Sequence, residues 1–171
     1  MRNVLFGLLA IVAGVVIVFG LFSGITDTAS FESPVTGDQV NNPTFVDYID
    51  GIGYLQGVWP NVVAFGTIAL LGLVALLGVF ALLVLGMRSR GIAITAQVVA
   101  IVTCVVAVVV GIAGIIDIRN VSEAVDQLKE SMDLPAINIG VSLAPMVLIG
   151  AGVFLGLVGL VAVIFGRVQE A

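Results

Sequence analysis

Apolar residues along this chain come in four long blocks, and polar and acidic residues gather between them. The blocks cover about 4–23, 62–87, 92–116 and 143–166. At 1.5 Å per residue, about 20 to 26 helical residues span roughly 30 to 39 Å, enough to cross the hydrocarbon core of a bilayer. Because a backbone in lipid must satisfy its own hydrogen bonds, each block is expected to be a helix despite its valines and glycines. The pattern predicts an all-α integral membrane protein, a four-transmembrane-helix bundle forming a single domain over 1–171.

The composition supports this prediction, since 60% of the residues are hydrophobic and only 10% are charged. Soluble globular domains carry far more charge. The first block is interpreted as a retained span rather than a cleaved signal peptide. Its apolar core is longer than a usual signal core, and no A-x-A cleavage site follows it in "SGITDTAS".

Charged residues predict the orientation of the bundle. Residues 23–61 contain five acids and no lysine or arginine, whereas four arginines flank the opposite ends of the blocks: Arg2, Arg88, Arg90 and Arg167. Basic residues near span ends favour the cytoplasmic side. We therefore expect a cell-membrane protein with both termini in the cytoplasm and outer loops at about 24–61 and 117–142. With a net charge of −5, nucleic acid is not an expected partner.

The first outer loop is predicted to contain a short amphipathic helix. Thr44 and Asp47 form a T-x-x-D helix start signal. Downstream, apolar residues recur at i, i+4, i+7 and i+11, which places them on one helical face: Tyr48, Ile52, Leu55 and Trp59. Glycines at 51, 53 and 57 each weaken such a helix by about 1 kcal/mol, so it needs membrane or protein to lie on.

The second outer loop is predicted to contain another short amphipathic helix, at roughly 120–132. Asn120 and Glu123 match a cap and its reciprocal partner. The apolar stripe consists of Val121, Val125, Leu128 and Met132. We expect this helix to lie on the membrane surface or against the first loop. Asn120 also opens a glycosylation sequon.

Small residues predict how the spans pack. One side of the third block carries Ala100, Thr103, Ala107, Gly111 and Gly114, and the fourth block contains Gly152-x-x-x-Gly156. Such stripes let helix backbones approach closely in lipid. They can serve the bundle itself or a partner subunit, and both interpretations stay open for Ala107, Gly111, Gly152 and Gly156.

Residue types that carry chemistry are scarce. Histidine is absent, and no Asp, Glu, Lys or Arg lies deep in a block. "GIGYLQG" misses the dinucleotide fingerprint in spacing and context. Asp47 and Asp50 could touch a cation, but a solvated acidic face is the preferred interpretation. Gln97 is expected to hydrogen-bond between helices, and Asp117 with Arg119 to anchor a helix end. We expect no catalytic residues, metal or cofactor, and hence no enzyme.

Both tyrosines and the only tryptophan lie within 44–60, just before the second block. Tyr48, Tyr54 and Trp59 suit an aromatic belt at the headgroup level. The same residue types dominate interaction hot spots, so a docking face on another integral membrane subunit is the alternative.

The topology resembles that of claudin-like tetraspan proteins, with four spans, inside termini and a longer first outer loop. Those proteins carry a W–GLW–C–C signature in that loop, whereas "GYLQGVW" here has one tryptophan and no cysteine pair. No residue role carries over, and the resemblance implies a tetraspan adhesion or scaffold protein by layout alone. The favoured function is a non-catalytic accessory, assembly or stabilising subunit of a larger membrane complex. A small oligomeric transporter or channel is the main alternative.

Overall fold

The computed structural model describes residues 2–27, 30–32, 39–87, 89–132 and 139–168. Four of its helices are long and apolar enough to cross a membrane, which indicates a multi-pass membrane protein. They are α1 (Arg2–Leu21), α3 (Val58–Gly86), α4 (Arg90–Met132) and α5 (Ala144–Val168). The predicted four-helix bundle is confirmed.

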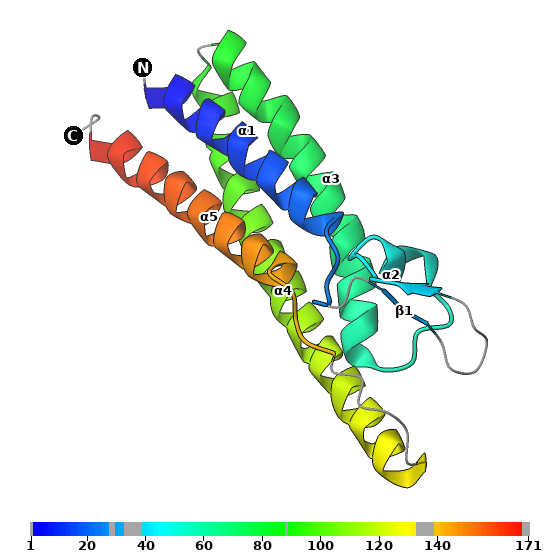
Figure 1. Cartoon of the computed structure of the whole chain (residues 1–171). Coiled ribbons are helices and arrows are strands. Elements are labelled where there is room, and N and C mark those ends of the chain that lie inside the picture. The colour runs from blue at the N-terminus through cyan, green and yellow to red at the C-terminus, as the bar shows by residue number, and fades with distance from the viewer. Residues whose placement is uncertain (1, 28–29, 33–38, 88, 133–138, 169–171) are drawn as a thin grey trace.

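The helices pack in a ring in which α1 contacts α3, α3 contacts α4, α4 contacts α5, and α5 contacts α1 (Figure 1). Both chain ends and the α3–α4 turn lie at one end of the bundle, called here the termini end. The loop segments lie at the other end and are called the cap (described residues 22–57 and 139–143). The helix ends next to Arg2, Arg90 and Arg167 therefore lie at the termini end.

The bundle interior combines alanines at close helix contacts with buried leucine, isoleucine and valine, for example Ile17, Leu70 and Leu148, while other large apolar side chains point outward. Ala10 in α1, Ala81 in α3 and Ala100 in α4 are completely buried. Phe19 and Leu82, by contrast, are 70% and 62% exposed. Lipid tails are as apolar as leucine, so outward leucines and phenylalanines cost little and close helix contact favours small residues inside.

The third span and the predicted 120–132 helix are one continuous helix. α4 runs for 43 residues, and Figure 1 shows its last turns extending beyond the other helices. The expectation of a separate helix capped at Asn120 was wrong. No glycine or proline lies between 115 and 132, so the i to i−4 hydrogen bonds continue and leave nothing at Asn120 to cap.

The predicted 44–59 helix is also shorter than expected. Only α2 (Asp47–Asp50) forms, and four residues of turn follow it. α2 ends at Asp50, and Gly53 and Gly57 then take positive φ angles of 98° and 110°, which redirect the chain into α3 at Val58. Trp59 therefore belongs to α3, and Pro60 sits in that helix's first turn, where proline is tolerated.

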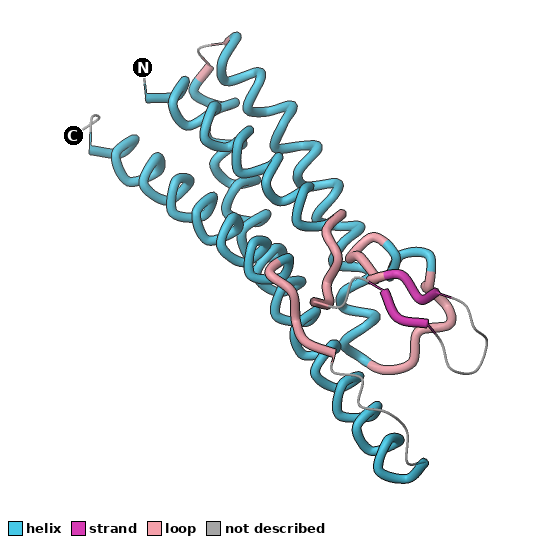
Figure 2. The backbone as a smooth tube through the Cα atoms, viewed as in Figure 1, coloured by secondary structure: helices cyan, strands magenta, loops and turns pink. Residues whose placement is uncertain are grey.

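One small sheet was not predicted. Strands β1 (Ser30–Glu32) and β2 (Gln39–Asn41) pair antiparallel, with Phe31 opposite Val40, and form a hairpin in the cap (Figure 2).

Candidate functional site

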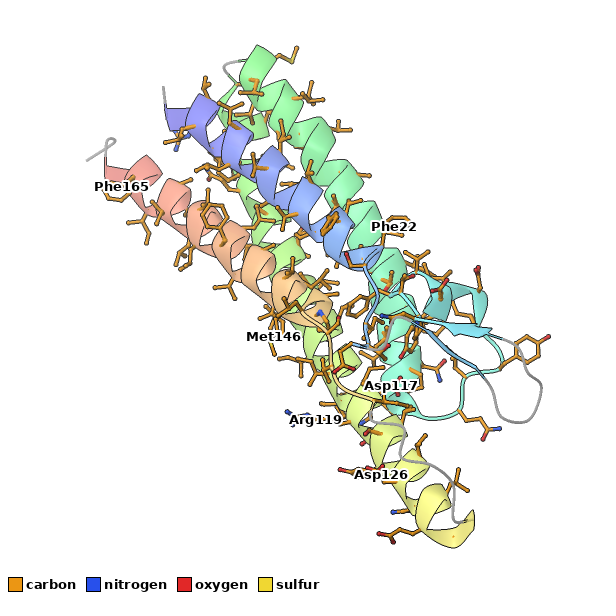
Figure 3. The ribbon with its side chains drawn as sticks, in the orientation of Figure 1. Phe22, Asp117, Arg119, Asp126, Met146 and Phe165 are labelled. Carbon is orange, nitrogen blue, oxygen red and sulfur yellow. The ribbon has the colours of Figure 1, made fainter. Side chains whose placement is uncertain are left out.

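The cap is fastened to the bundle by a tyrosine–carboxylate hydrogen bond. The Tyr48 hydroxyl, on α2, donates to Oδ2 of Asp117 at 2.7 Å. Asp117 is buried on α4, near the level of the cap, where Figure 3 labels it. Burial raises the pKa of Tyr48 far above its ordinary value, and the hydrogen bond to Asp117 and its negative charge raise it further. This phenol therefore stays protonated and keeps donating.

A second attachment joins three extended segments beneath the hairpin. The chain leaving α1 runs between the segment before α2 and the segment before α5. Its Ile25 amide donates to the Pro43 carbonyl at 2.8 Å, and the Ser142 amide donates to the Ile25 carbonyl at 2.8 Å. Asp27 and Gly140 exchange two hydrogen bonds. The Gly140 amide donates to Asp27 Oδ1 at 2.8 Å, and the Asp27 amide donates to the Gly140 carbonyl at 3.1 Å. These bonds connect both cap segments, which are far apart in sequence.

Thr26 and Asn42 form the centre of this attachment. The Thr26 hydroxyl donates to Asn42 Oδ1 at 2.7 Å, and the Thr26 amide donates to the same oxygen at 3.0 Å. Asn42 Nδ2 donates back to the Thr26 carbonyl. Gly24 packs directly on Asn42, where a side chain would collide. The Asn42 side chain thus satisfies both the amide and the carbonyl of Thr26.

Phe45 anchors the cap from below. It is completely buried and packs against Gly114 of α4, where an added Cβ would lie 2.8 Å from the ring. The absence of a side chain at Gly114 makes room for this ring.

Thr44 and Asp47 form the hydrogen bonds expected of the T-x-x-D pair, but α2 starts only at Asp47, with Val46 as its N-cap and no side-chain cap. The amide and hydroxyl of Thr44 both donate to Asp47 Oδ2, at 2.7 and 2.9 Å. The Asp47 amide contacts the Thr44 hydroxyl in return, at 3.4 Å. The Asp47 carboxylate therefore accepts its hydrogen bonds from Thr44, within the same turn. In the described part of the chain, no group of three His, Cys, Asp or Glu residues is arranged to hold a metal ion.

The structure divides the tyrosines, the tryptophan and the aliphatic residues of 48–59 into an inward set and an outward set. Tyr48 points inward to Asp117, and Ile52 and Leu55 are half-buried. Tyr54 is 88% exposed, and Trp59 is 39% exposed at the start of α3. The single apolar face predicted for Tyr48, Ile52, Leu55 and Trp59 does not form, because the chain turns at Gly53 and Gly57. The outward set is Tyr54, Val58 and Trp59.

The small-residue candidates lie inside the molecule, between α4 and α5. A Cβ at Gly152 would lie 2.8 Å from Ala107 Cβ, and one at Gly111 would lie 2.6 Å from Ile149 Cγ1. Gly156 packs on the sulfur of Cys104. All four candidates therefore serve the contact between α4 and α5.

Sequence reasoning missed the inward role of Asp117. It was expected to act with Arg119 as an interfacial anchor, but Asp117 is buried while Arg119 is exposed. The available signal was an acid at the end of a span opposite a tyrosine-containing loop. Thr26, Asn42 and Phe45 carried no sequence signal beyond turn propensity.

Comparison with protein-family models, curated proteins and solved structures found no significant match.

Proposed function

We propose that this protein is a non-catalytic accessory or assembly subunit of a larger membrane complex. Respiratory or other energy-converting, secretion and cell-envelope machineries each employ subunits of this kind. The observation that carries the proposal is an exposed set at the junction of cap and bundle: Tyr54 from the firmly attached cap, with Val58 and Trp59 from the start of α3.

The attachment of the cap matters because binding costs free energy when loops must become ordered. Tyr48 is held by Asp117, and Thr26 is held by Asn42, so the turn carrying Tyr54 is framed by fixed contacts. A pre-ordered surface avoids part of that cost. Tryptophan and tyrosine are the residues most enriched at interaction hot spots. The combination suits docking of a neighbouring integral membrane subunit.

Recovery of partners after affinity purification in mild detergent tests this proposal. Trp59→Ala should reduce partner recovery sharply, because truncating a hot-spot aromatic residue costs about 2 kcal/mol or more of binding. Phe19→Ala is the matched control, since Phe19 is 70% exposed on a different helix. It should leave recovery unchanged. Equal recovery from the wild type and Trp59→Ala, at equal membrane levels, would reduce these rings to a membrane belt.

The transporter alternative is separated by a flux assay. Purified protein in liposomes should pass neither ions nor small solutes above the level of protein-free vesicles. Reproducible flux that single substitutions alter would replace the accessory-subunit proposal with a transport function.

A further inference from the structure

A pocket opens beside α4, where this helix leaves the bundle and passes the cap. Its volume is about 420 Å³, and small-ligand sites typically measure roughly 300 to 1,000 Å³. One side of this α4 pocket is the segment 139–141, which precedes α5. The other side is formed by four residues of α4: Ile118, Arg119, Ser122 and Glu123.

The α4 pocket has an apolar floor and a wall that is held in place. Ile118 is 3% exposed and forms the floor. The opposite wall is fixed by the attachment of the cap, since Gly140 exchanges two hydrogen bonds with Asp27 and the Ser142 amide donates to the Ile25 carbonyl. The pocket is therefore formed before a ligand enters, which lowers the cost of binding.

The mouth of the pocket carries one positive and one negative side chain. Arg119 and Glu123 are both exposed and lie four residues apart on α4, which places their Cβ atoms about 5 to 6 Å from each other. Within the described part of the chain, neither takes part in an ion pair. Ser122 is half-buried between them and adds a hydroxyl group. The pocket thus offers a ligand a guanidinium, a hydroxyl and a carboxylate.

The α4 pocket lies at the level where a neighbouring span begins. Gly66 of α3 packs on Val110 of α4, and the two helices run antiparallel (Figure 1). α3 begins at Val58, eight residues before Gly66, so its start lies beside about residue 118 of α4. Because α3 is a candidate span from Val58 onward, the pocket is expected at the depth of the lipid headgroups.

A stripe of apolar residues on α4 leads from the span into the pocket. Its members recur with helical spacing and are exposed or half-exposed: Val105, Val109, Ile112 and Ile116. The same spacing continues to Arg119 and Glu123, so all six lie on one face of α4. Figure 3 shows Arg119 projecting on the same side of the molecule as Met146 of α5, which is 57% exposed. An acyl chain lying along this stripe would bring its headgroup to the pocket.

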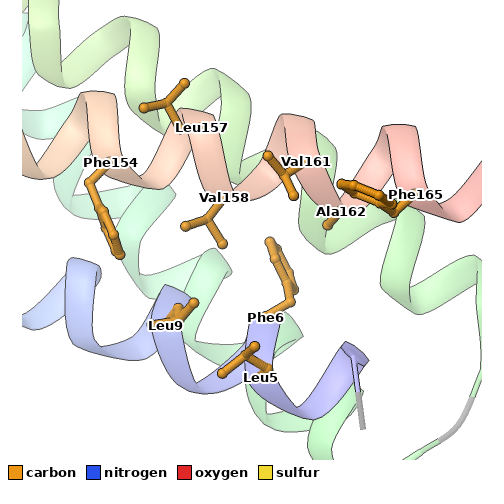
Figure 4. A pocket seen from close by; sticks show the side chains of 9 residues that line it. All are labelled: Leu5, Phe6, Leu9, Phe154, Leu157, Val158, Val161, Ala162 and Phe165. Atoms are coloured by element: carbon orange, nitrogen blue, oxygen red, sulfur yellow. The ribbon is translucent and has the colours of Figure 1, made fainter.

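The larger hollow between α1 and α5 has a different character (Figure 4). Its lining side chains are all hydrocarbon or aromatic, for example Leu9, Phe154 and Val158. This lining has no polar group that could distinguish one headgroup from another, whereas the lining of the α4 pocket has three.

We propose that the α4 pocket binds the headgroup of phosphatidylethanolamine, with Arg119 and Ser122 on the phosphate and Glu123 on the ammonium group. Only two carbon atoms and one ester oxygen separate the phosphorus from the ammonium nitrogen, which suits two side chains one helical turn apart. Phosphatidylglycerol has the phosphate but no cation for Glu123. Phosphatidylcholine has a cation without N–H groups, which proteins recognise with aromatic rings, and none of the described lining residues is aromatic.

Native mass spectrometry of the full-length protein tests this proposal. The delipidated protein is offered phosphatidylethanolamine, phosphatidylcholine and phosphatidylglycerol with identical acyl chains in equal amounts. One exposed ion pair corresponds to a factor of up to about five in binding. Phosphatidylethanolamine should therefore be retained about fivefold more than phosphatidylglycerol, with phosphatidylcholine between them.

Two pairs of variants test the two charges separately. Glu123→Gln should abolish the preference for phosphatidylethanolamine over phosphatidylglycerol. Glu130→Gln makes the same charge change on the same face of α4, two turns farther along, and should preserve the preference. Arg119→Gln should lower the retention of all three lipids by up to about fivefold. Arg90→Gln removes the same charge at the other end of α4 and should leave retention unchanged.

Three results would overturn the proposal. One is equal retention of phosphatidylethanolamine and phosphatidylglycerol by the wild type, and another is an equal loss of preference in Glu123→Gln and Glu130→Gln. The third is displacement of the lipid by an equal concentration of glycerophosphoethanolamine, which has the headgroup without acyl chains. That displacement would make the pocket a site for a soluble phosphate ester instead of a lipid.

Discussion

At the scale of single residues, Tyr48 shows how one side chain fixes a loop to a helix bundle. Its hydroxyl reaches a buried carboxylate on α4, 69 residues away in sequence. A carboxylate taken out of water needs hydrogen-bond donors, and a charge-assisted bond is about twice as strong as a neutral one. The Tyr48–Asp117 contact therefore stabilises both the cap and the segment of α4 that passes it.

Tyr48→Phe keeps the ring and removes the donor, which leaves Asp117 without this bond. The expected loss is about 1 to 3 kcal/mol of unfolding free energy, measured by thermal unfolding in detergent. Tyr54→Phe removes the same atom from a side chain that is 88% exposed, and should stay within about 0.5 kcal/mol. Equal effects in both variants would mean that the Tyr48–Asp117 bond contributes nothing.

The same bond predicts a dependence on pH. The pKa of Tyr48 is raised in the folded protein, first by burial and then by Asp117, above its ordinary value near 10. Its stabilising contribution is therefore complete below about pH 10 and declines above it, because the unfolded chain then releases the proton more readily. The difference in melting temperature between the wild type and Tyr48→Phe should narrow between about pH 10 and 11, without vanishing there, because the pKa of Tyr48 in the folded protein lies higher still. A constant difference across that range would contradict the assignment.

At the scale of elements, the spans could be predicted and the loop helices could not. Long apolar blocks leave a chain in lipid no alternative to the helix, so α1, α3 and α5 appear close to the predicted bounds. Helix N-capping signals such as Asn120 with Glu123 are weaker, because they compete with continuation of an existing helix. The helix α4 continues past Asn120. The helix predicted in the first loop, by contrast, is interrupted in the glycine-containing segment 51–57.

The contact between α4 and α5 provides a matched test of close packing. Ala at Gly152 would bring its Cβ to 2.8 Å from Ala107 Cβ and 3.3 Å from the Cys104 carbonyl oxygen. Overpacking of this kind costs about 1 to 3 kcal/mol. Gly150, two residues earlier on α5, has nothing within 4 Å, so Gly150→Ala should be neutral or stabilising by up to about 1 kcal/mol. Thermal unfolding in detergent measures both, and equal melting temperatures would show that α5 simply shifts to accommodate the methyl group.

At the scale of the whole molecule, the candidate site depends on contacts that no local pattern encodes. Asn42 meets Thr26 across 16 residues, and Gly140 meets Asp27 across 113. The first pairing closes the segment that carries the β1–β2 hairpin, whereas the second joins the connection after α1 to the connection before α5, which the folded bundle brings together. The sequence placed Tyr48, Tyr54 and Trp59 next to the start of the second span, but their division into an inward tyrosine and an outward pair required the three-dimensional structure.

The predicted orientation of the bundle rests on α4 and on the arginines of the sequence. α4 is continuous for 43 residues, or about 65 Å, and the hydrocarbon core measures only about 30 Å. Exposed Ser89, just before α4, and exposed Ser131, near its other end, must therefore lie on opposite sides if α4 crosses the membrane. In the sequence, four arginines flank the span ends on the Ser89 side, which predicts that this side is cytoplasmic.

Single cysteines in a Cys104→Ala background test that orientation in cells. An impermeant maleimide should label Ser131→Cys in intact cells and Ser89→Cys only after permeabilisation, because the bilayer separates the two positions. The Cys104→Ala parent is the control and should stay unlabelled under both conditions. The reverse pattern would mean that the orientation is opposite, with the exposed Tyr54 and Trp59 on the cytoplasmic side. Labelling of both positions in intact cells would show that α4 does not cross the membrane.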